Sequence, residues 1–219
     1  LSRQMAGRVV QAERRERGLA PPPSYDLGLR LPGARSARAR LLAVPAGDLP
    51  LGGQRVLRHP ALSLGPDDRV AITGPNGAGK STLVRHLLAE LRNGPERVVY
   101  LPQEVSAEEA RALLRAFRAL PPAQQGRVLT IVSALGSRPT RLLESQQASP
   151  GEVRKLLLAL GAVGEPHLIV MDEPTNHLDL PAIECLEAAL AGGGAALLLV
   201  SHGQRFLDRR ATVRWRLGP

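Results

Sequence analysis

The strongest candidate for chemistry in the sequence is a glycine-rich run that ends in a lysine and a hydroxyl side chain. Residues 74–81 follow the pattern G-x-x-x-x-G-K-[ST], between a short β-branched run and a predicted helix. Glycines in such a loop let backbone N–H groups converge on an anion, and the helix points its N-terminal dipole at the same place. The pattern therefore predicts that this loop binds the phosphates of a nucleoside triphosphate.

The side chains that close this loop have distinct expected roles. Lys80 is expected to reach the β- and γ-phosphates, Ser81 to ligate Mg²⁺, and Thr82 to add a phosphate donor. Lys80 is one of two lysines among 29 basic residues, which indicates selection for a compact ammonium at this position. The predicted nucleotide-binding residues are Gly74, Pro75, Asn76, Gly77, Ala78, Gly79, Lys80, Ser81 and Thr82.

Two adjacent carboxylates follow a second apolar run. Residues 167–172 predict a buried strand, and Asp172 and Glu173 stand at its C-terminal end. In an open parallel sheet, this edge is where ligands bind. Asp172 is expected to hold Mg²⁺ directly or through its water, and Glu173 to polarise an attacking water as general base.

Residues 172–179 read Asp-Glu-Pro-Thr-Asn-His-Leu-Asp, and this segment resembles the Walker B and D-loop region of ATP-binding-cassette (ABC) ATPases. Its form is similar to that of the ABC-F subfamily, which comprises soluble twin-cassette proteins that act on the ribosome. The resemblance extends from about Leu41 to Leu217. It implies an α/β P-loop fold with a mostly parallel core sheet, an antiparallel β subdomain, and an inserted α-helical subdomain at about residues 104–162.

The same resemblance assigns roles to three further residues. Gln103 takes the place of the Q-loop glutamine, which senses Mg²⁺ and the attacking water, and His202 takes that of the switch histidine, a donor to the γ-phosphate. Asp179 matches the D-loop aspartate, which works across the interface between two cassettes. The implied catalytic residues are thus Glu173, His202 and Gln103, and the implied metal-site residues are Ser81, Gln103 and Asp172.

A capped helix start occupies the place of the family signature. Ser149 and Glu152 have the spacing of a capping box, with Pro150 at the first helical position. Such a helix start presents free N–H groups to an anion, and by resemblance Ser149 and Gly151 engage the γ-phosphate held by a facing cassette. Ala148 and Pro150 depart from the usual Leu and Gly of this signature. The alternative is that these residues only begin a core helix.

The elements that must position these residues alternate along the chain. Strands are predicted at 69–73, 97–101, 167–172 and 195–200, with helices at 80–92, from 149, and at 180–190. Residues 106–147 are predicted to be helical with breaks at Pro121-Pro122 and near Pro139, and 212–217 form a closing segment. This order favours a mostly parallel sheet covered by helices on both faces.

Composition restricts the class of protein. The 219 residues suit one domain with an appendage, and no apolar run approaches the ~18 residues of a membrane helix, which argues against membrane insertion. One cysteine, Cys185, excludes an internal disulfide framework and a multi-cysteine metal site, and fits a cytoplasmic setting. The chain starts at Leu1 and not at Met, so we expect a fragment of a longer protein.

The net charge of +9 is concentrated at one end of the chain. Residues 1–40 hold nine Arg and three acids, and we expect a charged helix at 1–18 and a connector rich in Pro and Arg at 20–40. This basic segment either binds RNA phosphates or is a solvated tail. Residues 41–219 are expected to form the ATPase domain.

Three functions are compatible with these patterns. The first is an ATPase cassette that uses ATP and Mg²⁺ and forms the C-terminal cassette of an ABC-F protein, such as an antibiotic self-resistance protein. Such a protein acts on the ribosome and its RNA, and the cassette needs a facing cassette for full activity. The second is the nucleotide-binding subunit of an ABC membrane exporter, but the acidic-and-glycine motif expected before the signature is absent from residues 142–148. The third, a DNA-repair or chromosome-structural ATPase, predicts zinc cysteines or long coiled coils that the sequence lacks.

The sequence departs from the family pattern at two further places. No aromatic residue stands at 45–60 to stack on a base, and Gly203 replaces the Asp common in ABC-F proteins.

Overall fold

A computed structural model describes residues 30–91, 94, 97–137 and 149–218 of the chain. The charged helix expected at 1–18, the first part of the expected connector, and Ala148 lie outside the described residues.

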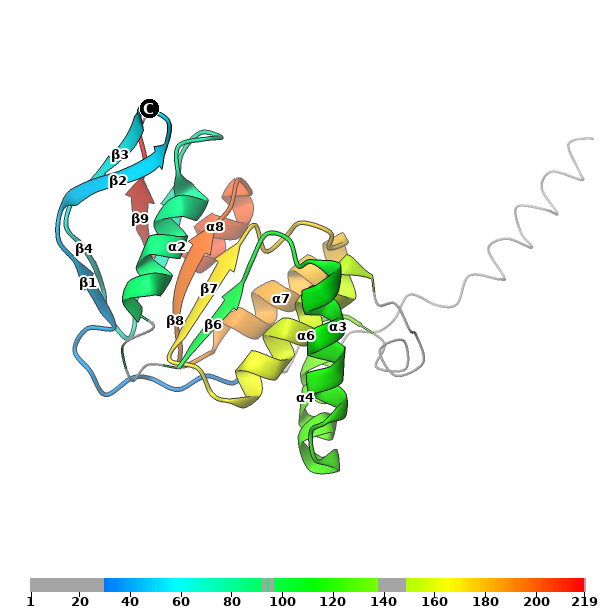
Figure 1. The fold of residues 1–219 in the computed structure, drawn as a ribbon. Helices are drawn as coiled ribbons and strands as arrows, with labels where there is room; N and C mark the ends of the chain where they lie inside the picture. Colours follow the sequence, from blue (N-terminus) through cyan, green and yellow to red (C-terminus); the bar gives the residue numbers. More distant parts are fainter. Residues whose placement is uncertain (1–29, 92–93, 95–96, 138–148, 219) are drawn as a thin grey trace, which may run out of the picture.

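The centre of the described part is a five-stranded parallel sheet with the strand order β6-β7-β8-β5-β9 (Figure 1). Its strands are β5 (Arg69–Thr73), β6 (Val98–Leu101), β7 (Leu168–Asp172), β8 (Ala196–Val200) and β9 (Val213–Arg216). Strands β7 and β8 are buried along their whole length, which agrees with their apolar sequences up to Asp172 at the end of β7. The strand predictions at 69–73, 97–101, 167–172 and 195–200 are confirmed within one residue at each end.

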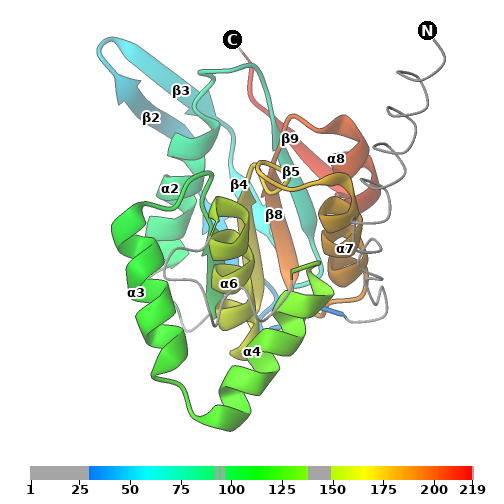
Figure 2. The same cartoon turned by 90° about the vertical axis from the view of Figure 1, so that its right-hand side faces the viewer.

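Helices cover both faces of this sheet, as the alternation of elements predicts. Helix α2 (Lys80–Leu91) lies on one face, against Val70 and Ile72 of β5, while α6 (Pro150–Val163) and α7 (Leu180–Ala191) lie on the other (Figures 1 and 2). Ala71, which lies between these two β5 residues, packs into the cluster on the α6 and α7 side. The sheet therefore separates two apolar layers and exposes its carboxyl edge.

Two antiparallel pairs flank the parallel sheet on the α2 side (Figure 1). Strands β1 (Leu42–Val44) and β4 (Leu62–Leu64) form one pair, and β2 (Gly47–Gly52) and β3 (Arg55–His59) form a hairpin. The α/β fold with a parallel core and antiparallel pieces is thus confirmed.

Helices α3 (Ala107–Arg118) and α4 (Pro122–Ala134) stand between β6 and β7 in the chain, together with α6. The break between α3 and α4 falls at Pro121-Pro122, as predicted from the sequence. Capping boxes start α3 at Ser106 and α6 at Ser149. A short helix, α8 (Gln204–Arg210), precedes β9, and no helix of the described residues is both long and apolar enough to cross a bilayer.

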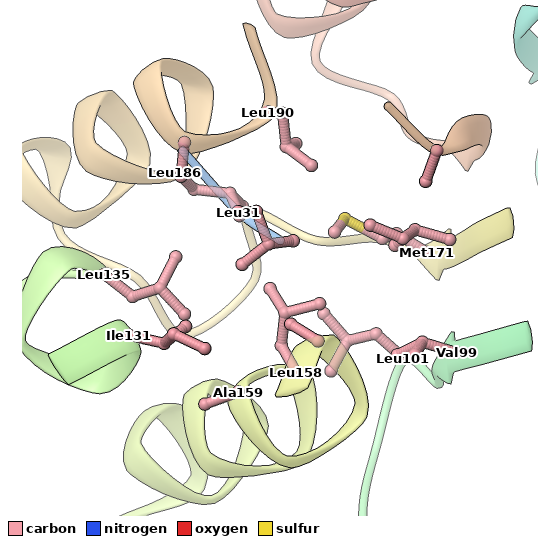
Figure 3. Close-up of a cluster of buried hydrophobic side chains, with 14 of the residues drawn as sticks. Leu31, Val99, Leu101, Ile131, Leu135, Leu158, Ala159, Met171, Leu186 and Leu190 are labelled. Carbon is pink, nitrogen blue, oxygen red and sulfur yellow. The ribbon is translucent and has the colours of Figure 1, made fainter. Parts of the chain in front are cut away.

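The larger apolar cluster joins the sheet to α3, α4, α6 and α7. Figure 3 shows the part of this cluster around Leu31. Leu31 is 3% exposed within it, near Leu186 and Leu190, and its amide donates to the Ala189 carbonyl at 2.8 Å. Arg35 adds a paired contact with Asp67 at 2.6 and 2.7 Å. Leu31 and Arg35 of the expected connector therefore contact the folded part, whereas residues 37–40 are exposed. The domain boundary at residue 40 and the helical subdomain at 104–162 remain predictions.

Candidate nucleotide-binding site

A cleft of about 620 Å³ lies where β5, β7 and β8 end. It brings together residues that are far apart in sequence and were predicted to act together. The residues that line it are Leu51, Arg55, Asn76, Gly77, Gly79, Lys80, Ser81, Thr82, Gln103, Asp172, Glu173, Asn176 and His202. Gly74, Pro75 and Ala78 belong to the same loop and line neighbouring depressions.

The loop between β5 and α2 has a backbone that other residue types adopt only with strain. Gly77 and Gly79 have φ angles of 76° and 93°. A Cβ at Gly79 would also stand 2.7 Å from Cδ2 of Leu51, which packs onto the loop from the hairpin. Glycine is therefore required at this position by both the dihedral angle and the close approach.

Lys80 begins α2 and is 8% exposed. Its Nζ donates to the carbonyls of Gly74 and Pro75 at 2.9 and 3.0 Å, so that the ammonium lies inside the curve of the loop. No acidic residue stands in the first turn of α2, and the N-terminal dipole adds to the charge of the ammonium. The end of the cleft formed by this loop is therefore suited to an anion with several oxygens.

The two predicted carboxylates are buried at the end of β7. Asp172 is 3% exposed and Glu173 is 7% exposed. Glu173 has a φ of 48°, a left-handed conformation that costs energy for any residue with a side chain and is typical of functional sites. Its amide donates to the Val200 carbonyl at 2.8 Å, which fixes the turn to the neighbouring strand β8.

The carboxylate of Glu173 has one engaged oxygen and one open oxygen. Oε2 accepts from the Ser201 hydroxyl and the His202 amide, both at 3.3 Å. Oε1 is buried and has no hydrogen-bond partner among the described residues, and Nε2 of His202 lies 3.5 Å away. A carboxylate oxygen without a hydrogen-bond partner, on a residue that lines a cleft, can accept a proton from a bound water.

Ser149, Gly151 and Asp179 form a second group outside this cleft. Ser149 caps α6, since its hydroxyl accepts from the Glu152 amide at 3.3 Å, and Asp179 caps α7 by accepting from the Ala182 amide at 3.0 Å. A Cβ at Gly151 would stand 2.8 Å from the His177 carbonyl, so only glycine lets the D-loop lie against the start of α6. Ser149, Gly151 and Asp179 are thus brought near one another by the D-loop, and none of them lines the cleft.

Three residues that line the cleft were not predicted. Leu51 and Arg55 come from the β2–β3 hairpin, and Arg55 donates from Nη2 to the Gly77 carbonyl. Asn176 lies in the recognised D-loop segment, and its amide donates to the Glu173 carbonyl at 3.2 Å. The described residues that line the cleft include Leu51 and Arg55 but no phenylalanine, tyrosine or tryptophan.

The donor set of the cleft suits Mg²⁺ bound together with phosphates. The described residues contain no cluster of three or more His, Cys, Asp and Glu side chains that could hold a metal by themselves. Mg²⁺ is commonly bound by one or two carboxylates, hydroxyls and substrate phosphates instead. Asp172, Ser81 and Gln103 line one cleft and could supply such a set.

The family model described as "ABC transporter" matches residues 57–176, more than half of the chain. The chain belongs to the ABC transporter ATP-binding family. The matched range contains the phosphate loop, Gln103, the capped start of α6 and both carboxylates. Members of this family hydrolyse ATP, so the cassette is an ABC ATPase domain.

Curated relatives of this ABC cassette come from more than one kind of system. It is 42% identical to the tylosin resistance ATP-binding protein TlrC of Streptomyces fradiae, over 70% of this chain and 30% of TlrC. It is 35% identical to the ATP-binding protein Uup of Caulobacter vibrioides over 80% of this chain and 30% of Uup. It is 38% identical to the zinc import ATP-binding protein ZnuC of Paracoccus denitrificans over 71% of this chain and 65% of ZnuC.

Solved structures agree with the ABC fold. A putative metal-chelate type ABC transporter in an inward-facing conformation matches with a TM-score of 0.63 at 20% identity, over 81% of this chain and 80% of that chain. The archaeal ribosome recycling factor aABCE1, solved with the ribosomal stalk protein aP1, also matches with a TM-score of 0.63 at 20% identity, over 89% of this chain and 40% of that chain. At these identities the similarity establishes the fold alone.

Proposed function

We propose that this cassette binds MgATP in the cleft and hydrolyses it, with Glu173 as the general base. The observation that carries the proposal is that Glu173 lines the same cleft as Lys80 and the phosphate loop and has a buried Oε1 without a hydrogen-bond partner among the described residues. A general base must lie within reach of the water it activates, and the rest of the cleft must hold the phosphates in line with that water.

The residues of the cleft that the sequence predicted divide the work of this reaction. Lys80 and the loop amides would hold the β- and γ-phosphates, and Ser81, Asp172 and Gln103 would hold Mg²⁺, which would neutralise phosphate charge when bound. Oε1 of Glu173 takes a proton from a water molecule while the oxygen of that water attacks the γ-phosphorus of ATP. The bond between the γ-phosphorus and the oxygen that bridges to the β-phosphate then breaks, and ADP and phosphate leave. His202 donates to the γ-phosphate during this step.

We further propose that the active unit is a pair of cassettes. Ser149 is exposed at the start of α6, and its group of signature and D-loop residues lies outside the cleft of its own chain. A helix start with a hydroxyl is a suitable site for the γ-phosphate of a facing cassette. The ATPase rate measured against protein concentration tests this proposal. Turnover per molecule should rise with concentration, and brisk turnover independent of concentration would contradict the pairing.

The biological role we propose is that of a second cassette in a soluble, cytoplasmic ABC-F protein that acts on the ribosome. The Asp-Glu-Pro-Thr-Asn-His-Leu-Asp segment resembles that subfamily, and the identity to TlrC and Uup supports a place among such proteins. Residues 1–40 would then be the end of the linker between two cassettes, with arginines that contact RNA phosphates. The tylosin resistance named for TlrC suggests an antibiotic-resistance role.

A second candidate role is that of the ATP-binding subunit of a membrane transporter. The 38% identity to ZnuC supports it, since the chain covers 65% of that zinc import protein but only 30% of TlrC. Such a subunit would bind membrane-spanning partner chains and would have no affinity for ribosomes.

Ribosome co-sedimentation separates these roles. The parent protein with Glu173→Gln should bind ATP without hydrolysing it and should be trapped on ribosomes in an ATP-dependent way. Absence from the ribosome pellet at every nucleotide condition would contradict the ribosomal role. Recovery with a membrane fraction that contains partner chains would support the transporter role instead.

A further inference from the structure

Helix α6 carries a buried guanidinium that no step described so far uses. Arg154 is 3% exposed, although arginine is rarely buried without partners. Burial lowers the pKa of Arg154, and the nearby charges of Asp172 and Glu173 partly oppose that shift. The hydrogen bonds of its two Nη atoms go to backbone carbonyls, so the group holds main-chain segments in place.

The four carbonyls come from two segments of the cleft. Nη1 donates to the carbonyls of Pro102 and Gln103, which follow β6. Nη2 donates to the Glu173 carbonyl at 2.9 Å and to the Asp172 carbonyl at 3.3 Å, at the end of β7. A planar guanidinium with several fixed donors can bridge two such segments at once, and an ammonium cannot do so with the same geometry.

One of the four hydrogen bonds of Arg154 goes to Glu173, whose backbone has a strained conformation. Glu173 has a φ of 48°, and its amide and carbonyl are both held, by the Val200 carbonyl and by Arg154 respectively. A left-handed conformation persists only where surrounding contacts over-determine it. The position of the Glu173 side chain depends on that backbone, so Arg154 helps to fix the position of the carboxylate.

We propose that Arg154 is the positioning residue that couples α6 to the water-activating carboxylate and to Gln103. Ser149, the N-cap of α6, stands five positions before Arg154, at the end of the helix that would face a second cassette. A shift of α6 is then transmitted through the guanidinium to both sides of the cleft. This inference rests on the proposed ATPase function and adds a route by which a facing cassette sets the geometry of hydrolysis.

Lys155 offers a matched control on the same helix. It is a partly buried cation whose Nζ donates to the Gly136 carbonyl at 3.1 Å, at the end of α4 and away from the cleft. Burial lowers the pKa of Lys155 as well. Arg154→Met and Lys155→Met therefore both remove a long cation and a carbonyl contact, but only the first touches the cleft.

The first measurement is hydrogen–deuterium exchange of the full chain at residues 173–178, which requires no turnover. Arg154→Met should speed exchange there by about tenfold or more, because the Glu173 turn loses a partner, while Lys155→Met should leave it within about twofold. Equal exchange in both variants would overturn the proposal. This measurement tests the role of Arg154 even if the wild type does not hydrolyse ATP. Failure of the proposed ATPase function can therefore be told apart from failure of the Arg154 proposal.

The second measurement compares turnover with nucleotide affinity. Arg154→Met should lower turnover by about tenfold or more, because a misaimed base costs rate, while the Kd for a fluorescent ATP analogue stays within about twofold. Arg154→Lys keeps the charge and the stem, guards against misfolding, and should lower turnover at unchanged Kd, since it lacks the planar fork. Wild-type turnover in Arg154→Lys, or a parallel loss of turnover in Lys155→Met, would overturn the proposal.

Discussion

Nε2 of His202 lies 3.5 Å from Oε1 of Glu173, the carboxylate oxygen that has no hydrogen-bond partner among the described residues. The other oxygen, Oε2, is engaged by the Ser201 hydroxyl and the His202 amide. His202 thus contacts the carboxylate through its backbone and approaches it with its ring. This arrangement leaves one oxygen of Glu173 for water and places a ring donor beside it.

Glu173→Gln should remove the general base and retain the shape of the cleft. Turnover is expected to fall by about 10²- to 10⁴-fold while ATP affinity is retained. Glu165→Gln is the matched control, because Glu165 is also a glutamate with positive φ, at 49°, and does not line the cleft. Steady-state phosphate release measures both variants, and similar losses in the two would contradict the assigned base.

His202→Ala should lower turnover by about 10²-fold, the usual cost of one lost donor to the transition state. His86→Ala serves as control, since His86 faces His59 at a ring distance of 6.0 Å and does not line the cleft. Single-turnover hydrolysis with excess protein gives the rate of the chemical step. A rate in His202→Ala equal to that of the control would exclude a role for the ring.

The two capping boxes allow the helix-capping and partner-binding roles of Ser149 to be separated. Ser106 and Ser149 make the same pair of capping bonds, with distances of 2.8 and 3.2 Å at Ser106 and 2.8 and 3.3 Å at Ser149. Either serine changed to Ala should cost about 1 kcal/mol of stability. Only Ser149→Ala should also lower the concentration-dependent part of the ATPase rate. If both variants lose activity equally, Ser149 acts as a cap alone.

Two helical glycines should respond to alanine in opposite directions. A Cβ at Gly126 meets nothing within 4 Å, so Gly126→Ala should stabilise the domain by about 0.5–1 kcal/mol. A Cβ at Gly161 would stand 2.4 Å from Cγ2 of Val99, where α6 packs on β6, and Gly161→Ala should destabilise by about 1–3 kcal/mol. Urea unfolding measures both, and changes of the same sign would contradict the packing of α6.

Cys185, the single cysteine, reports opening of the core. It is 2% exposed, and burial raises the pKa of its thiol, so alkylation at neutral pH should require unfolding of the domain. MgATP at about 100 times its Kd should slow labelling by about 100-fold, because the ligand stabilises only the folded state. Lys80→Ala should abolish this slowing. A labelling rate unaffected by MgATP in the wild type would contradict binding to the folded cassette.

The parts of the fold that were predictable are those with a local signal. Residues 69–73 and 168–172 are short apolar runs buried on both faces, and a glycine-rich turn or two carboxylates directly follow them. The start of α6 was likewise readable, because a capping box involves only neighbours in sequence. These signals located the phosphate loop, the carboxylates and Ser149 without tertiary information.

Other parts depend on contacts that sequence spacing does not encode. Strand β2 (Gly47–Gly52) has no fully buried residue and contains Gly and Pro, and it forms by pairing with β3. Arg154 looked like any charged residue on a helix, and only the folded chain brings four carbonyls around it. The positions of Arg55 and Leu31 likewise depend on contacts with residues far away in the sequence, which spacing does not reveal.

The most direct test of the central claim is the equilibrium affinity for a fluorescent ATP analogue with Mg²⁺, measured for the wild type and Lys80→Ala. Loss of a charge-assisted contact to phosphate should weaken binding by about tenfold or more. Lys155→Met changes the only other lysine of the chain and should bind like the wild type. Equal affinity of Lys80→Ala and the wild type would contradict the assignment of this cleft as the triphosphate site.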